Sequence, residues 1–442
     1  MSERAVTDAA SKVRRPRMLS PLREHLRDTF WFAPTAAMVL VFLVWLLAAG
    51  LDDLIVEGLR DGGDVDTVKD LMGFADDART VVSTVSSAMM TFIGVVFSIS
   101  LVAVQMAGGQ FSPRVVRLFV RSRITKATFA VFLATFLLSL LVLTSYDGEK
   151  DPELITSVPF VQAFLTLGMV GLSVLLFVLY VNSTLRMMRV SQVIDRITGE
   201  AFRVVERMPY ADGSGRQGSG DERAVVAYDG PAGVLRDVNI ARLVRVARGH
   251  GVVLWLIPRI GDFVVPGTPV FAVHGGAAPS RRALRSCMSV AAERTFHQDL
   301  GFGLRVLADI ALRALSAAVN DPTTAVQAID RIVQFLAAIG RRPLDVLRYP
   351  DRDGVVRLVQ PVPGWEELVD LGFTEIRGCA VHSPQVTRRV FAGLDDLLAL
   401  VPAERREPLL RHRELLAQAV ERSVPDAADR AFALRPDRQG IG

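Results

Sequence analysis

The feature that most constrains this chain is an uncharged run from Thr80 to Pro113, which lies between Arg79 and Arg114. A helix needs about 20 apolar residues to cross the hydrocarbon core of a bilayer, and this run is longer. Small and polar residues recur in it every three or four positions, which places them on one face of a helix. The members of this polar strip are Thr84, Ser87, Thr91, Gly94, Ser98 and, one heptad later, Gln105. Because lipid does not favour such a face, we expect the polar strip to face protein or water.

Three further stretches are long and apolar enough to cross a bilayer. The four candidate spans are Ala33–Leu51, Val81–Ala107, Ala127–Ser145 and Pro159–Leu185. The remainder of the chain resembles a soluble sequence. The predicted fold class is therefore an α-helical integral membrane protein with four transmembrane helices and a cytosolic α+β region, which contains a small β module and helices.

The connecting segments predict the orientation in the membrane. The loop from Asp52 to Arg79 holds nine acidic residues against three basic ones, whereas the loop from Gly108 to Lys126 holds five basic residues and no acid. The third connection is acidic again, and Arg186 and Arg189 follow the fourth span. The positive-inside rule then puts both termini in the cytoplasm of a bacterial cell, with the spans in its inner membrane. No removable signal peptide is expected.

The basic loop between the second and third spans favours a short amphipathic helix. Ser112 and Pro113 are suited to its start, and Arg114, Arg117 and Arg121 recur on one face. We expect these arginines to contact the headgroups of the inner leaflet, either from a helix lying on the membrane or from an extension of the third span.

We divide the chain into seven segments by composition and periodicity. They are a basic cytosolic N-terminus (1–32), a four-helix transmembrane domain (33–190), a helix with a flexible linker (191–222), a small β-rich module (223–276), a helical segment (277–345), a C-terminal α+β segment (346–425) and a loose tail (426–442). The β module has short β-prone runs separated by turns, and one helix capped by Asn239. Lipoate and biotin are attached through a lysine, and no lysine follows Lys150, so both are excluded. The remaining interpretation is a structural or ligand-sensing module.

Two groups of polar residues stand out in the helical segment. Arg305, Asp309 and Arg313 form an i, i+4, i+8 ladder. A solvated ion-pair ladder is the simpler interpretation, and an anion or partner site is the sharper one, because two arginines sharing one carboxylate leave donors free. Asn320 and Asp321 precede Pro322, and Asp321 is suited to capping the next helix; a phosphate or metal at that helix start is the less favoured alternative.

In the C-terminal α+β segment the local patterns predict alternating strands and helices. We expect strands at Val355–Val359 and Ile376–Val381, and helices at Trp365–Leu371, Gln385–Leu400 and around Ala403–Ser423. The tail beyond these helices is rich in Pro, Asp and Arg, and is expected to be loose.

Two motifs together resemble one known family. They are Gly94-Val-Val-Phe-Ser98 continuing through Gln110-Phe-Ser-Pro-Arg114, and Ala314-Leu-Ser316 continuing through Asn320-Asp-Pro-Thr-Thr-Ala325. In this order they are similar to the bacterial "predicted membrane protein" family, a domain of unknown function. The resemblance covers about residues 30–415 and implies four N-terminal spans with a soluble C-terminal half. It implies no activity.

Most functional classes lack their signatures in this sequence. There is no Gly-rich phosphate loop, HExxH, Cys/His cluster or Gly-x-Ser-x-Gly elbow, so we expect neither an enzyme nor a cofactor or metal site. The six histidines are scattered, and Cys287 and Cys379 are expected to be free thiols. The predicted position of the basic residues at the inner leaflet accounts for the basic charge of the chain, so no nucleic-acid partner is expected.

Two functions are compatible with these patterns. In the first, which we favour, several copies form a channel-like pathway for an ion or small solute, lined by the polar strip and regulated by the cytosolic half through a small ligand of unknown identity. In the second, the polar strip only packs helices, and the protein is a membrane-tethered sensor or scaffold. Both have the lipid bilayer as a partner. Only the first requires a homo-oligomer, since four spans make too narrow a pathway alone.

Overall fold

The chain folds as two compact units. The computed structural model describes residues 29–61, 65–110, 122–146, 159–187, 189–208 and 221–441. The membrane unit is built from residues 22–109 and 115–189, and the C-terminal unit chiefly from residues 190–442. An α-helical region is thus followed by a region of helices and small sheets, as the sequence predicts.

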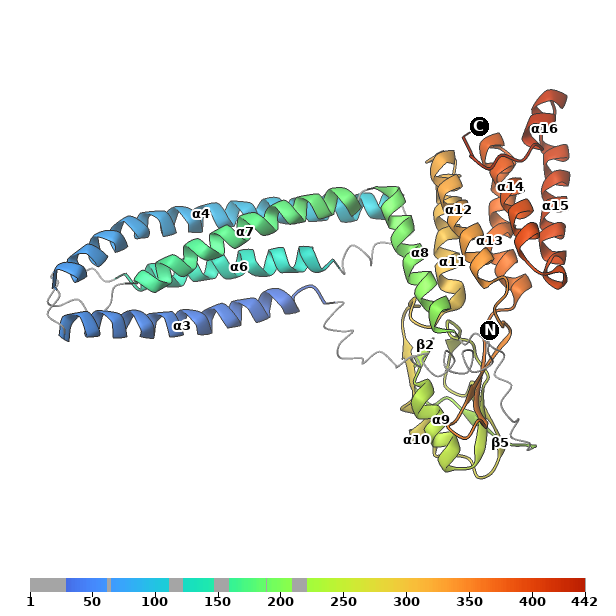
Figure 1. Cartoon of the computed structure of the whole chain (residues 1–442), viewed down its shortest axis with the longest axis horizontal. Helices are drawn as coiled ribbons and strands as arrows, with labels where there is room; N and C mark the ends of the chain where they lie inside the picture. Colours follow the sequence, from blue (N-terminus) through green and yellow to red (C-terminus); the bar gives the residue numbers. More distant parts are fainter. Residues whose placement is uncertain are drawn as a thin grey trace, which may run out of the picture. The chain divides into compact units, whose positions relative to one another are not determined.

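Among the described residues, the membrane unit has four long helices, which pack alongside one another (Figure 1). Their bounds are α3 Phe32–Asp61, α4 Val65–Gln110, α6 Arg123–Thr144 and α7 Phe160–Met187. Each contains a stretch that is long and apolar enough to cross a membrane, which confirms the four predicted spans.

Two of these helices continue well beyond the predicted spans. The acidic segment from Asp52 to Arg79, predicted as a loop, is helical on both sides of residues 62–64. It contains no proline, and therefore nothing in it forces a helix to end. α4 has 46 residues. At 1.5 Å per residue it is about 69 Å long, more than twice the thickness of a hydrocarbon core, so much of it extends past the bilayer.

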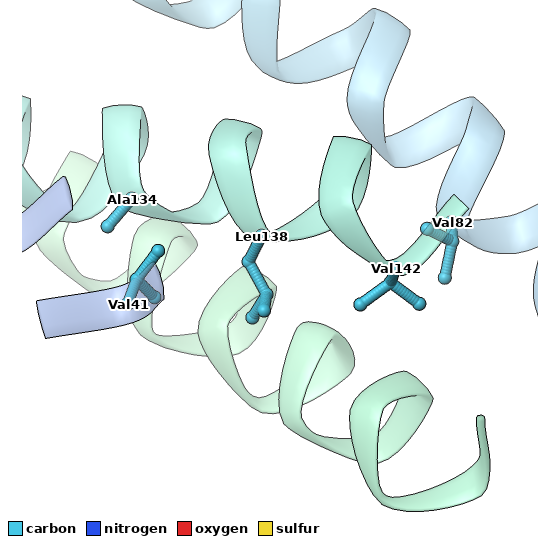
Figure 2. Close-up of a cluster of buried hydrophobic side chains, with 5 residues drawn as sticks. All are labelled: Val41, Val82, Ala134, Leu138 and Val142. Atoms are coloured by element: carbon cyan, nitrogen blue, oxygen red, sulfur yellow. The ribbon is translucent and has the colours of Figure 1, made fainter. Parts of the chain in front are cut away.

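α6 is the centre of the membrane unit. Half of the residues in its most apolar 18-residue stretch are buried, whereas fewer than a quarter are buried in the corresponding stretch of each of the other three helices. Figure 2 shows one cluster of this core, in which side chains of α6 meet others from α3 and α4. The cluster comprises Val41, Val82, Ala134, Leu138 and Val142. On the α7 side, the hydroxyls of Thr135 and Ser173 are hydrogen-bonded at 3.0 Å, as is common between membrane helices.

In the C-terminal unit, α8 (Val190–Arg207) packs against α11 (Leu300–Ala314) and α12 (Pro322–Ile339). α8 buries one apolar face, made by Val193, Ile194, Ile197, Ala201, Val204 and Val205. α8 and α11 approach closely at Gly303, because a Cβ at that position would lie only 2.4 Å from the Cβ of Ala201. Only glycine fits there. The helix bundle is completed by α13 (Trp365–Ala380) and α14 (Pro384–Leu400), which pack against α15 (Glu407–Ser423).

Two sheets lie at the other end of the C-terminal unit (Figure 1). The first has the order β1-β5-β3-β8-β7, with bounds Glu222–Ala227, Pro269–Gly275, Val252–Leu256, Val356–Pro361 and Val346–Pro350. The second has the order β4-β2-β6, with bounds Phe263–Val264, Gly233–Val238 and Met288–Ala291. β3 and β8 pair in parallel, and all other pairs are antiparallel. The helices α9 (Ile240–Gly249) and α10 (Arg281–Arg285) join strands of these sheets.

Two further secondary-structure predictions were wrong. The predicted strand at Ile376–Val381 is the second half of the continuous helix α13. Its residues Val369, Phe373, Ile376 and Ala380 are all buried, so the helical period simply continues through the apolar run. Residues 277–345, which were expected to be helical, contain the strand β6. This strand completes the second sheet by pairing with β2.

The C-terminal tail is not loose as predicted. It forms the helix α16 (Ala427–Ala433), which packs against α14. The guanidinium of Arg388 lies 4.1 Å from the ring centre of Phe432, and Arg388 Nε donates to the carbonyl of Arg435 at 3.1 Å. Gln385 Nε2 donates to the carbonyl of Gly440 at 2.6 Å. These contacts come from α14 and could not be read from the composition of the tail.

Candidate functional site

The polar strip of α4 faces away from the helices of its own unit. All six members, Thr84, Ser87, Thr91, Gly94, Ser98 and Gln105, are exposed. The opposite face of α4 is the one that packs, through Val82, Ser86, Met89, Val96 and Ala103. At 3.6 residues per turn, the two faces lie about half a turn apart around the helix. Within one chain the strip therefore packs against no other helix of the described residues.

Hydroxyls at the start of the strip are bonded to their own helix. Thr84 Oγ1 donates to the carbonyl of Thr80 at 2.9 Å, and Ser87 Oγ donates to the carbonyl of Ser83 at 3.2 Å. Each hydroxyl proton is thereby used, while the oxygen keeps its acceptor lone pairs. The strip thus offers oxygen acceptors along an otherwise apolar helix.

A buried tyrosine fixes α4 to α7. The hydroxyl of Tyr180 donates to the carbonyl of Val96 at 3.0 Å and lies 2.6 Å from Ser100 Oγ. Since a phenol has only one proton, Ser100 donates to Tyr180. This bond holds the packed face of α4 against the unit and so determines which face is left outside. No local sequence pattern reveals this role of Tyr180, because its partners lie on another helix.

A buried carboxylate ties α3 to the start of α7. Asp52 is 1% exposed, and its oxygens accept from the backbone N–H groups of Val161 at 2.7 Å and Gln162 at 3.3 Å. They also accept from Gln162 Nε2 at 3.1 Å. Gln162 Oε1 accepts in turn from Ser145 Oγ at 2.8 Å, and that hydroxyl accepts from Trp45 Nε1 at 3.2 Å. Asp52 thus caps α7, which is distant in sequence, and its negative charge is attracted to the positive N-terminal end of that helix dipole.

This carboxylate also corrects an expectation about the spans. The predicted spans were drawn between charged residues and therefore contained none. In the structure the apolar stretch of α3 runs from Phe32 to Gly58 and includes Asp52. The basic residues Arg114, Arg117 and Arg121, which we expect at the inner leaflet, lie outside the described residues.

In the C-terminal unit, Arg305 joins α11 to α13. Its Nε donates to Asp309 at 2.7 Å, its Nη2 lies 2.7 Å from the same carboxylate, and its Nη1 donates to Glu375 of α13. All three nitrogens of the guanidinium therefore face carboxylates. The pair between Arg305 and Asp309 is the first rung of the predicted ladder, which continues to Arg313. The anion site proposed there stays a prediction, and three of the five N–H donors of Arg305 already point to carboxylates.

Asp321 caps α12, as predicted. Its side chain accepts from the backbone N–H of Thr324 at 3.0 Å, and Pro322 occupies the first turn. Asn320 has a positive φ of 46°, in the left-handed region that asparagine tolerates. It lets the chain turn back, so that the N–H of Asp321 donates to the carbonyl of Ala314 at 2.8 Å. The Asn-Asp-Pro motif is thus a tight connection between α11 and α12.

One buried histidine joins α15 to α13. His412 is 2% exposed, and its Nε2 lies 2.7 Å from Asp370 Oδ1, which also accepts from Arg411 at 2.6 Å. The other ring nitrogen, Nδ1, is buried and has no hydrogen-bond partner among the described residues. Burial lowers the pKa of His412 below its ordinary value, although the hydrogen bond to Asp370 opposes this. The pairing spans 42 residues of sequence, so no local spacing could reveal it.

No cluster of three or more His, Cys, Asp or Glu side chains that could hold a metal ion occurs in the described part of the chain. Asp299, which stands near His297 in sequence, caps α11 and accepts two hydrogen bonds from Arg294, at 2.7 and 2.9 Å. Cys287 and Cys379 are free thiols, the first buried and the second exposed.

Comparison with known proteins gives the chain relatives but no activity. The model of a family described as "Predicted membrane protein (DUF2254)" matches residues 27–396. An uncharacterized protein of Mycobacterium bovis and one of Mycobacterium tuberculosis are each 28% identical over 430 residues, which covers 93% of this chain and 80% of the relative. No solved structure matches the chain.

Proposed function

The chain belongs to the DUF2254 family of predicted membrane proteins, and from this premise we propose that it forms a channel-like pathway for an ion or small solute between several copies. The observation that carries the proposal is the outward position of the polar strip. A row of hydroxyls, one glycine and one glutamine, all exposed in the single chain, is unfavourable against lipid. The same face of a second copy, with water between the copies, would satisfy it.

The charge pattern along α4 favours cations as the solute. Before the strip, α4 carries four acidic residues, Asp66, Asp70, Asp76 and Asp77, against two basic ones, Lys69 and Arg79. An acidic entrance raises the local concentration of cations, and the acceptor oxygens of the strip can replace part of a cation's hydration shell. The positive-inside rule supports a bacterial inner membrane with both termini in the cytoplasm. In this orientation the acidic entrance is on the outside and the C-terminal unit is the cytosolic regulatory region.

Ion flux in liposomes containing the purified full chain tests the proposal. We compare the wild type with Thr91→Leu and Ser98→Leu, which place bulky apolar groups in the strip. Thr144→Leu is the matched control, because Thr144 is also exposed but lies at the end of α6. We expect cation flux in the wild type and the control, and a loss of at least tenfold in both strip variants.

Crosslinking between copies, taken together with the flux, separates a pathway from simple packing. In a chain with Cys287→Ala and Cys379→Ala, we expect Ser98→Cys to crosslink copies in native membranes, whereas Leu175→Cys, exposed on α7, does not. Crosslinking without flux of any cation or anion would favour the alternative of a scaffold packed through the strip. A chain that is monomeric in native membranes would refute both the pathway and the packing between copies.

A further inference from the structure

A pocket in the membrane unit lies apart from the polar strip. It has a volume of about 290 Å³ and is formed where α4 and α7 end and α6 begins, with Phe30 ahead of α3. This is about twice the volume of an apolar cavity of ~150 Å³ that binds benzene. Its walls include Phe97, Leu101, Val104 and Phe129. Since Phe97 and Leu101 are exposed, the pocket is open toward the surroundings of the helices.

One polar group in the pocket wall is left unsatisfied. Thr184 is 3% exposed, and its Oγ1 has no hydrogen-bond partner among the described residues. Other membrane-unit hydroxyls in comparable positions are bonded, for example Thr128 and Thr166, which donate to carbonyls of their own helices at 2.9 Å. Leaving a buried hydroxyl unpaired costs free energy, and such a group in a pocket wall points to a partner that the pocket receives.

The residues around the pocket are basic. Lys126 follows the lining residue Thr125, and its Nζ donates to the carbonyl of Thr29 at 3.1 Å, next to Phe30. Arg123, before Thr125, is exposed, whereas Arg186 lies on the other side of α7 from Thr184 and donates to Asn182 Oδ1 at 3.3 Å. No acidic residue occurs in the described residues 29–31, 97–110, 122–129 or 176–187, which carry the pocket lining. The charge therefore complements an anion.

We propose that this pocket binds one anionic phospholipid. An acyl chain would occupy the apolar walls, an ester carbonyl would accept from Thr184, and the phosphate would lie near Lys126. Each feature of the ligand then has its own counterpart: apolar volume, an orphan donor and positive charge. The proposal does not depend on whether the polar strip conducts, because none of the six strip residues lines the pocket.

Native mass spectrometry of the delipidated full chain in detergent tests this site. The probes are phosphatidylglycerol and phosphatidylcholine with identical acyl chains. We expect one phosphatidylglycerol per chain to be retained at concentrations where phosphatidylcholine is not. Each cation near the headgroup contributes about fivefold in affinity. Lys126→Gln should therefore lower phosphatidylglycerol binding about fivefold, toward the phosphatidylcholine value.

Two further variants test the acyl-chain site and the hydroxyl of Thr184. Val104→Phe fills the pocket and should abolish retention of either lipid, while Val102→Phe, exposed and outside the pocket, should not. Thr184→Val keeps the shape but removes the donor, and should weaken both lipids about fivefold. Equal binding of the two lipids, equal effects of the two phenylalanine variants, or displacement by soluble glycerol phosphate would each overturn the proposal.

Discussion

The two units of this chain place their large apolar side chains in opposite ways. In the membrane unit many of them are on the outside, among them Leu40, Leu47, Leu54, Phe97, Leu175 and Val178. In the C-terminal unit most are enclosed, among them Phe271, Phe335, Phe373 and Phe391, and Trp255 and Phe263 are among the exceptions. The surface of the C-terminal unit instead carries pairs such as Arg413 with Asp395 and Arg331 with Asp195, each at 2.7 Å.

This contrast teaches that burial has a different meaning in each unit. In water, apolar area removed from solvent drives folding. In a bilayer, lipid is as apolar as leucine, so close packing and hydrogen bonds between helices take over that role. An exposed leucine on α7 therefore needs no explanation, whereas the exposed hydroxyls of α4 do. The following predictions test this contrast.

The largest expected difference is between matched leucines in the two cores. Leu336 in α12 and Leu138 in α6 are both fully buried. Leu336→Ala should lower the free energy of unfolding by about 3 kcal/mol, because both the transfer free energy of the leucine side chain and the contacts around the resulting cavity are lost. Leu138→Ala should cost about 1.5 kcal/mol, since only packing contacts are lost. Hydrogen–deuterium exchange of α12 and α6 in the full chain measures both. Equal losses of stability in the two helices would contradict this difference between the two cores.

The next effect concerns the carboxylate that caps α7. Asp52→Asn should destabilise the membrane unit by about 2 kcal/mol, because the new amide would meet the N–H groups of Gln162 instead of accepting from them. The adjacent Asp53→Asn is the control, since Asp53 is exposed. Thermal unfolding in detergent measures the difference. A result in which the two variants are alike would show that this network does not stabilise the unit.

A smaller effect is expected for the docked tail. Phe432→Ala should cost about 1 kcal/mol through the lost contact with Arg388 and should speed amide exchange in Ala427–Ala433. Leu410→Ala, on the exposed side of α15, is the control and should leave that exchange unchanged. If the tail already exchanges as fast as an unfolded peptide in the wild type, its docking is refuted.

The smallest effect is a dependence on pH. The C-terminal unit holds His412 neutral, with a lowered pKa, so unfolding takes up a proton below the ordinary histidine pKa of 6.5. The stability that this contributes is complete above about pH 6.5 and is lost as the pH falls further. His412→Gln should reduce the loss of stability between pH 7 and pH 5. The exposed His382→Gln should not, and the opposite ranking would contradict the role of burial.

Some of the fold follows from local patterns and some does not. The four apolar runs predict the four helices, because about 20 apolar residues without a helix-breaking residue leave the backbone little choice in a membrane. Asp321 was predicted as a cap from its neighbour Pro322, and α12 begins there. The strand predicted at Ile376–Val381 was wrong, because a short apolar run fits a strand and a buried helix equally well.

The sheet of the β module shows the limit of segment-by-segment prediction. Residues 223–276 contain strands β1, β3 and β5, yet β8 from beyond residue 345 pairs in parallel with β3, through Leu254 with Leu358 and Trp255 with Val359. No turn connects these strands, so no local signal predicts their pairing. The module and the C-terminal segment therefore share one sheet.

By itself, the sequence determined the membrane helices, the caps and the spacing of the polar strip, since each depends on residues within a few turns of one another. Only the tertiary structure decided which way the strip faces, which helix Asp52 caps and where Thr184 is left without a partner. These depend on side chains from helices that are far apart in sequence, such as Tyr180 holding the opposite face of α4. A helical period can state that two faces exist, and packing alone selects the one that stays outside.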